Sequence, residues 1–131
     1  MNVLKKITIA SSLQNLLIVQ RFIEELCEEY NINNTIFGNI SVAVTEAVKN
    51  AITHGNKENN TKNVDIKFGK DNKSFIFIIH DQGNGFDYNN LPDPTDINQE
   101  NTSGRGLYLI KSLSDKVEFL DGGKTIKIKF D

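Results

Sequence analysis

Residues 75–86 read FIFIIHDQGNGF, an apolar run that ends in a polar, glycine-rich hexapeptide. A short apolar run bounded by turn residues is typical of a buried strand. The hexapeptide DQGNGF, residues 81–86, suits a tight turn, because glycine adopts positive φ without steric cost and Asp bonds to its own following backbone. The same glycines would also let the backbone approach a ligand closely, so the rest of the chain must decide between a turn and a ligand site.

The composition predicts a single domain, residues 1–131. Of these residues 38% are hydrophobic, which is enough for one core. The 15 Lys and Arg residues nearly balance 17 Asp and Glu residues, and no basic run is interleaved with aromatics, so we expect no nucleic-acid partner. No apolar stretch is long enough to span a bilayer, so we expect no membrane partner and a soluble, cytoplasmic protein. Cys27 is the single cysteine and lies in an apolar helical stripe, which favours a buried thiol.

Upstream of the opening stretch, the pattern predicts a strand followed by two long amphipathic helices. Residues 3–10 alternate as a strand, and Ser11 or Ser12 is placed to cap the first helix. Apolar residues then recur at helical spacing. A second helix is predicted from about Thr35 to Thr53, with Gly55 placed to end it.

The remaining elements are two hairpins separated by a loop and a short helix. They are strands at 64–68 and 74–80, a helix at 107–113, and strands at 117–120 and 125–130. Hairpins make a sheet largely antiparallel, and amphipathic helices cover one of its faces. We therefore expect an α+β fold, a two-layer sandwich with a largely antiparallel mixed sheet and its helices on one face.

The loop from Gly83 to Gly106 is unusually long for a compact domain. It holds four glycines and both prolines of the chain, with almost no apolar periodicity. A loop of this length is uncommon unless it is functional or mobile. The length of this loop therefore indicates that the glycines at its two ends have a function.

Glu46 and Asn50 lie four residues apart in the predicted second helix and so share one of its faces, among apolar neighbours. A solvated helix face is the common explanation of such a pair. Here the apolar surroundings favour a ligand, a metal or a partner, because an unpaired buried carboxylate is costly. An amide beside a carboxylate also suits Mg²⁺, which takes few protein ligands and keeps waters and substrate phosphates.

Two further glycine motifs follow. Ser103-Gly104-Arg105-Gly106-Leu107 places two glycines immediately before a predicted helix, where free amides form an anion site and an arginine is placed to contact phosphate oxygens. An ordinary flexible entry into a helix would look the same. Gly122-Gly123-Lys124-Thr125 is, by itself, most simply a hairpin turn.

In this order and at these spacings, the motifs resemble the Bergerat ATP-binding fold of histidine kinases, gyrase-type ATPases and, at this length, anti-sigma factor serine kinases. The match covers nearly the whole chain. Glu46-xxx-Asn50 with His54-Gly55 resembles the N box, Asp81-x-Gly83-x-Gly85 the G1 box, Gly104-x-Gly106 the G2 box, and Gly123-x-Thr125 the terminal Gly-Thr element with one residue inserted.

The resemblance implies a role for each of these motifs. Glu46 would act as a general base, and Asn50 would hold Mg²⁺ that bridges the phosphates of ATP. Asp81 would accept the exocyclic amine of adenine, while Gly83 and Gly85 would let the loop pass close to the nucleotide.

It also implies that residues 86–103 form an ATP lid and that the amides of Gly104–Gly106 lie near the phosphates. Thr125 would lie near adenine, an assignment that the inserted Lys124 weakens. Neither the chemistry nor the resemblance gives His54 a role in binding or catalysis. A contact with the dipole at the C-terminus of the helix is the simplest explanation of its position.

A stand-alone domain of this kind resembles an anti-sigma factor kinase, because large ATPases of this fold need a transducer domain and histidine kinases need a phosphoacceptor domain. The resemblance implies a serine/threonine kinase that sequesters a sigma factor or similar regulator and phosphorylates an anti-anti-sigma-type antagonist, and it favours a homodimer. The alternative is a nucleotide-gated binding module without phosphotransfer. The presence of Glu46 favours phosphotransfer, and a plain interaction domain would leave the long loop unexplained.

Overall fold

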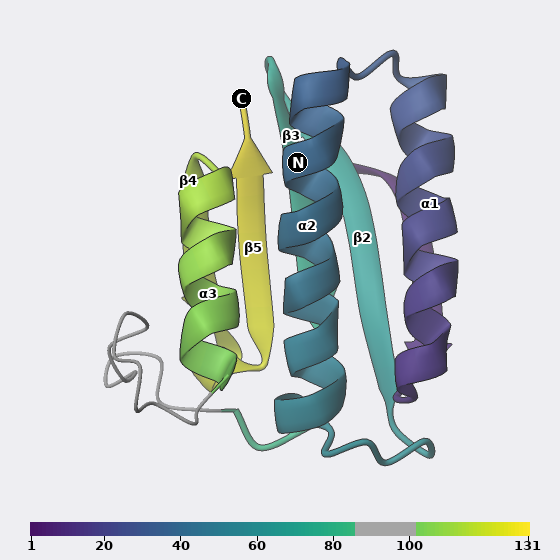
Figure 1. The fold of residues 1–131 in the computed structure, drawn as a ribbon, viewed down its shortest axis with the longest axis vertical. Coiled ribbons are helices and arrows are strands. Elements are labelled where there is room, and N and C mark those ends of the chain that lie inside the picture. Colours follow the sequence, from purple (N-terminus) through teal and green to yellow (C-terminus); the bar gives the residue numbers. More distant parts are fainter. Residues whose placement is uncertain (86–101) are drawn as a thin grey trace.

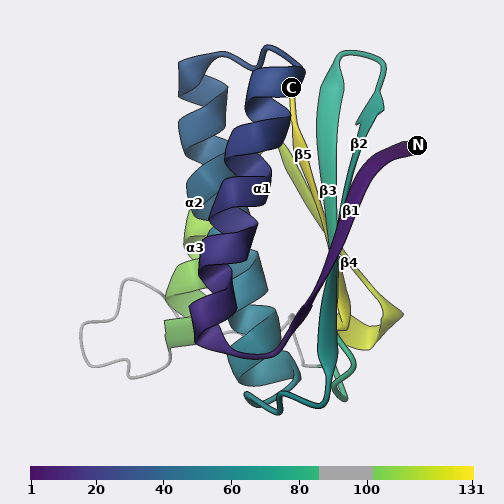
Figure 2. The same ribbon diagram turned by 90° about the vertical axis from the view of Figure 1, so that its right-hand side faces the viewer.

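The computed structural model describes residues 1–85 and 102–131, with side chains described from residue 106 onward in the second range. All of its long helices lie on one face of a twisted sheet, and Figure 2 shows the two layers edge-on. The elements in chain order, labelled in Figure 1, are β1 (Asn2–Ala10), a 3-10 turn (Leu13–Asn15), α1 (Leu16–Glu29), α2 (Asn34–Asn50), a π-helical turn (Ala51–Gly55), β2 (Asn63–Asp71), β3 (Ser74–His80), α3 (Thr102–Leu113), β4 (Lys116–Leu120), a second 3-10 turn (Asp121–Gly123) and β5 (Thr125–Phe130).

The five strands lie in the order β1-β2-β3-β5-β4. Every paired neighbour among the described strands is antiparallel, so the two-layer α+β prediction is confirmed and the expected mixed sheet is antiparallel throughout this part of the chain. The sheet is antiparallel rather than mixed because β5 lies between β3 and β4. The chain crosses over through α3 to β4 at the sheet edge, and β5 then turns back into the space between β3 and β4.

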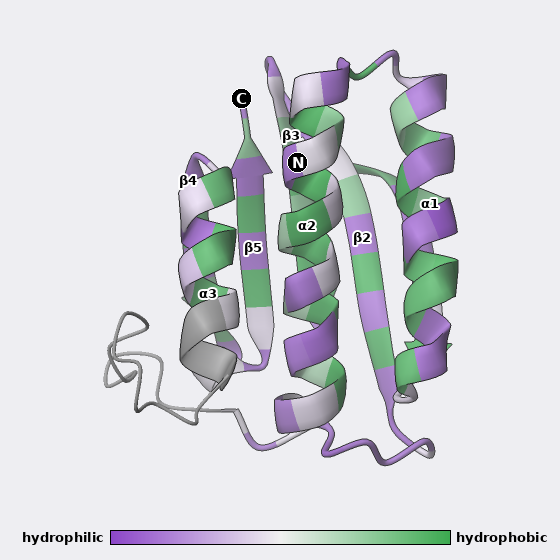
Figure 3. Cartoon of the chain, viewed as in Figure 1, coloured by the Kyte–Doolittle hydropathy of each residue, from purple (hydrophilic) through white to green (hydrophobic). Residues whose placement is uncertain are grey.

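The core lies between the sheet and the helices. Alternate residues of the central strands are fully buried toward the helices, including Phe68, Phe77, Ile79 and Ile128. The ring centroids of Phe68 and Phe77 are 5.1 Å apart. Apolar and polar bands alternate along β2 and β5 in Figure 3, as expected for a sheet with one covered face.

The predicted serine caps are wrong. A 3-10 turn separates β1 from α1, and neither Ser12 nor Asn15, which occupy the cap positions of these two helices, makes a side-chain capping bond. Ser11 is fully buried; its hydroxyl donates to the Lys62 carbonyl at 2.8 Å and accepts from the Asn56 side-chain amide at 2.8 Å. The hydroxyl that the local pattern predicts as a helix cap is thus hydrogen-bonded to two residues distant in the sequence.

The beginning of α3 also differs from the prediction. The helix begins at Thr102 rather than at Leu107, so Gly104 lies in its first turn and Gly106 in its second. Glycine disfavours a helix interior, which is why the sequence pattern predicts a later start.

Cys27 lies inside the core, as predicted, and burial raises the pKa of its thiol to about 11. None of the described helices combines the length and the hydropathy needed to cross a bilayer.

Candidate functional site

The predicted pair Glu46 and Asn50 faces the second turn of α3. Both side chains are half-buried on α2. A Cβ atom built on Gly106 would lie 2.9 Å from Oε2 of Glu46 and 3.3 Å from Nδ2 of Asn50. The structure therefore brings together residues from the motifs that resemble the N box and the G2 box. Glycine at position 106 leaves the space that both polar side chains occupy.

Asp81 lies directly after β3 and is only 6% exposed. Its Oδ1 accepts the N–H of Gly83 at 2.8 Å, and its own N–H donates to the carbonyl of Lys124 at 2.9 Å. Burial raises the pKa of Asp81, while the Gly83 N–H and the positive charges of His80, Lys124 and Lys62 act in the opposite direction. Asp81 is thus a buried carboxylate at the end of the central strand.

The end of the π-helical turn packs against this aspartate. A Cβ on Gly55 would overlap the Asp81 carboxylate, and a Cβ on Gly83 would overlap the Gly55 carbonyl. Two glycines from separate motifs therefore let the helix end and the segment after β3 approach more closely than any side chain would allow.

Gly85 contacts the turn between β4 and β5. Its φ is +80°, in the left-handed region that favours glycine, and a Cβ there would overlap the Gly122 carbonyl. Conformation and space both require glycine at this position. The motif that resembles the G1 box is consequently in backbone contact with the turn that leads to Thr125.

Thr125 is 6% exposed, and its hydroxyl is engaged twice. Its Oγ1 donates to Oδ2 of Asp121 at 2.7 Å and lies 2.7 Å from Nδ1 of His80. A hydroxyl has a single proton to donate, so Nδ1–H of His80 is the donor in the second bond. His80 and Thr125 are also paired across β3 and β5, and this hydrogen-bonded chain ties the two strand ends together.

Sequence reasoning missed Asn56, which follows the predicted end of the second helix at Gly55. Asn56 is 1% exposed; its amide donates to Ser11 and to the Asn63 carbonyl, and its oxygen accepts the N–H of Gln82 at 2.8 Å. It therefore joins the loop after α2 to the segment that carries Asp81. Its partners are distant in the sequence, so no local signal identifies it.

Some predicted residues are not part of this cluster. His54 is exposed in the last helical turn before Gly55, consistent with a contact to the helix dipole. Residues 86–101 of the predicted lid and the side chain of Arg105 lie outside the described residues. Within residues 1–85 and 102–131, no three His, Cys, Asp or Glu side chains gather at a metal-binding distance.

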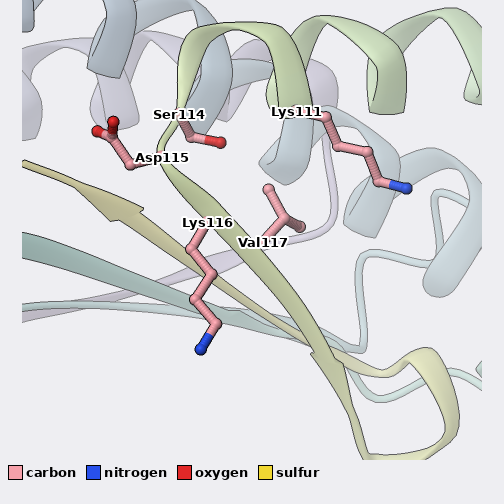
Figure 4. Close-up of a pocket in the computed structure, with 5 residues that line it drawn as sticks. All are labelled: Lys111, Ser114, Asp115, Lys116 and Val117. Atoms are coloured by element: carbon pink, nitrogen blue, oxygen red, sulfur yellow. The ribbon is translucent and has the colours of Figure 1, made fainter.

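A hollow of about 230 Å³ lies elsewhere, where α3 meets β4 (Figure 4). Lys111, Ser114, Asp115, Lys116 and Val117 line it. The two lysine side chains point away from each other in Figure 4, and Lys116 forms an ion pair with Glu118 at 3.2 Å. No predicted site residue lines this hollow, so it is separate from the cluster around Asp81 and Glu46.

The two-layer fold and the order of these motifs along it define a class of protein. Residues 9–130 match the model of the histidine kinase-like ATPase domain. The chain therefore belongs to this family, and the resemblance noted from the four motifs is confirmed.

Curated relatives narrow the comparison within that class. The chain is 33% identical over 98 residues to the serine-protein kinase RsbW of Bacillus licheniformis, covering 68% of this chain and 61% of that protein. It is 34% identical over 86 residues to the same-named kinase of Bacillus subtilis, covering 60% and 53%, and 36% identical over 96 residues to that of Staphylococcus aureus strain MW2, covering 66% and 60%. The chain thus matches about three-fifths or less of the length of these relatives.

Proposed function

We propose that the chain is a protein serine/threonine kinase that binds Mg-ATP and transfers its γ-phosphoryl group to a partner protein. The observation that carries this proposal is the meeting of Glu46 and Asn50 with Gly106 of α3, because it combines a proton acceptor and an amide oxygen at the place where the two helices approach each other. The names of the relatives, all serine-protein kinases, support the same reaction.

The described residues fit a bound nucleotide. Asp81 is buried and forms no ion pair with any described side chain; one of its oxygens accepts from Gly83, and the carboxylate keeps the capacity to accept the exocyclic amine of adenine. Gly83 keeps a side chain away from this carboxylate, and Gly85 lets the following backbone lie against Gly122. Gly104 lies in the first turn of α3, whose free N–H groups suit a phosphate.

Asn50 is the residue that would hold Mg²⁺, through its side-chain oxygen. A single protein ligand fits this ion, since Mg²⁺ binds mostly through waters and substrate phosphates. When bound, the ion supplies positive charge that offsets the triphosphate in a chain whose own net charge is -2.

In the transfer step, Glu46 accepts the proton of the attacking serine or threonine hydroxyl. The hydroxyl oxygen forms the new bond to the γ-phosphorus, and the bond from that phosphorus to the bridging oxygen of ADP breaks. The other residues act by positioning: Asp81 orients the adenine ring, and the missing side chain at Gly106 leaves room for Glu46 and Asn50. Positioning and charge stabilisation supply most of the catalysis in phosphoryl transfer, so a small domain is sufficient.

We also propose the partners that the family resemblance implies. The protein would sequester a sigma factor or a similar regulator, and its substrate would be an antagonist protein of the anti-anti-sigma type. It would work in the cytoplasm as one domain, residues 1–131, within a homodimer. The polar face of α1 with Gln20, Arg21 and Glu24 is a candidate partner surface.

The decisive experiment replaces Glu46. In Glu46→Gln, transfer of labelled γ-phosphate to a co-purified partner should fall at least about a hundredfold, because general-base catalysis is lost, while ATP affinity stays within about threefold. Glu118→Gln, a carboxylate on β4, is the matched control and should behave as wild type. Undiminished transfer by Glu46→Gln would remove Glu46 as the base.

The second candidate function, a nucleotide-gated binding module, predicts a different outcome. The wild type would then bind ATP and capture a partner but transfer no phosphate to it. Calorimetry with EDTA tests the metal separately: ATP that binds as tightly in EDTA as with Mg²⁺ would contradict the role of Asn50.

A further inference from the structure

Lys124 lies directly beside Asp81, in the residue just before β5. The two backbones are joined by the bond from the Asp81 N–H to the Lys124 carbonyl, at 2.9 Å. Lys124 is half-buried, and its positive charge is one of those that lower the pKa of Asp81. This bond continues the pairing of His80 with Thr125 by one residue, so Lys124 is the cross-strand neighbour of Asp81, the residue that the proposed function assigns to adenine.

Thr125, the residue that the family resemblance places near adenine, is already committed. Its hydroxyl donates to Asp121 and accepts from His80, both at 2.7 Å. The single hydroxyl proton is bound to Asp121, so Thr125 can donate a hydrogen bond to a nucleotide only by giving up that bond. Moreover, Thr125 and His80 pair across the strands next to the core pair Ile79 and Ile126, and successive residues of a strand point to opposite faces. Thr125 thus lies on the sheet face opposite the helices, where it positions the ends of β3 and β5.

We infer that Lys124, rather than Thr125, is the second side chain that reads the base, donating a hydrogen bond to the ring nitrogen next to the exocyclic amine that Asp81 accepts. This inference rests on the proposed function. An ionised aspartate only accepts and a lysine only donates, so the two side chains form an acceptor–donor pair. The complementary ligand is a purine that presents an amine donor beside a ring-nitrogen acceptor, which is the Watson–Crick edge of adenine.

The test compares ATP with 1-deaza-ATP, in which that ring nitrogen is replaced by C–H, by calorimetry with Mg²⁺. Wild type should bind 1-deaza-ATP about tenfold more weakly than ATP, because a charge-assisted hydrogen bond is lost. Lys124→Met should bind both nucleotides equally, near the wild-type affinity for 1-deaza-ATP. Lys127→Met, a lysine from the sheet face opposite the helices, is the matched control and should keep the tenfold preference.

A conservative variant separates contact from structure. Lys124→Arg also donates hydrogen bonds and should retain most of the preference for ATP, with an unchanged thermal midpoint. A tenfold preference that persists in Lys124→Met would overturn the inference while leaving the proposed function intact. Loss of the preference in Thr125→Val, with Lys124→Met unaffected, would return the role to Thr125. A wild type that binds neither nucleotide would contradict the proposed function itself.

Discussion

The core under the helices and the cluster at the end of α2 use space in opposite ways. In the core, the rings of Phe68, Phe77 and Phe130 fill the volume between the layers. In the cluster, glycines at positions such as 55 and 83 bring backbone against backbone and leave no volume for a side chain. The difference teaches that stability and ligand geometry reside in separate parts of this small domain, so each can be changed without the other.

The largest expected effect comes from emptying the core. Phe77→Ala should lower the free energy of unfolding by about 3–5 kcal/mol, because the ring is fully buried and contacts Phe68 and Phe130. Urea unfolding measures the loss, and the fraction that remains folded should bind ATP with wild-type affinity. Weaker binding by that folded fraction would show that core and cluster are coupled, and would break the comparison.

The next effect concerns Asp81, whose replacement should weaken ATP binding without lowering stability at neutral pH. Asp81→Asn should weaken ATP binding about tenfold or more, since the ionised acceptor is lost. Because burial raises the pKa of Asp81, the folded protein binds this proton more readily than the unfolded chain does. The ionised carboxylate therefore costs stability at pH values above its folded pKa.

Thermal midpoints against pH check the sign. At neutral pH the Asp81→Asn variant should be as stable as wild type or more so. Its advantage should shrink as the pH falls through the folded pKa of Asp81, where the wild-type carboxyl takes up its proton. A variant that is less stable than wild type by the same margin at every pH would mean that the carboxylate is a stabilising group.

A smaller effect should come from filling the space at Gly106. Gly106→Ala should reduce phosphotransfer about three- to tenfold, because the new methyl group displaces Glu46 and Asn50. Gly38→Ala on α2 is the matched control, since nothing lies within 4 Å of its Cβ position. That variant should gain about 0.5–1 kcal/mol of stability from helix propensity with no change in transfer. Equal transfer by both variants would contradict the role of Gly106.

The smallest effect is expected outside both regions. Lys5 and Glu29 form an ion pair at 3.0 Å, with side chains 43% and 51% exposed. Lys5→Ala should leave the thermal midpoint unchanged within error at physiological salt, because solvent screens such a pair. A drop of several degrees would identify the anchoring of β1 to α1 as a third determinant of stability.

Elements whose signals are local are the ones the sequence predicts well. The strands Ser74–His80 and Thr125–Phe130 are predicted to the residue, because turn residues flank each apolar pattern. The start of α3 is predicted too late, since helical glycines at 104 and 106 look like a loop when their neighbours on α2 are unknown. Ser11 is misassigned because its partners Lys62 and Asn56 lie 51 and 45 residues away.

The candidate site divides in the same way. The family resemblance implies that Asn50 and Gly106 both lie near the phosphates of ATP, and in the structure Glu46 and Asn50 face Gly106. The engagement of Thr125 by His80 and Asp121 could not be predicted, because it depends on the register of β3 against β5. The chemical roles of these residues stay predictions until the variants are measured.

The burial of Cys27 has a practical consequence for such measurements. A thiol with a pKa of about 11 inside the core is almost entirely protonated at neutral pH and reacts slowly with alkylating dyes. Lys49→Cys, at an exposed position of α2 next to Asn50, would accordingly provide a single reactive handle without removal of the native cysteine. A fluorophore attached there would report nucleotide arrival in real time from one labelled chain.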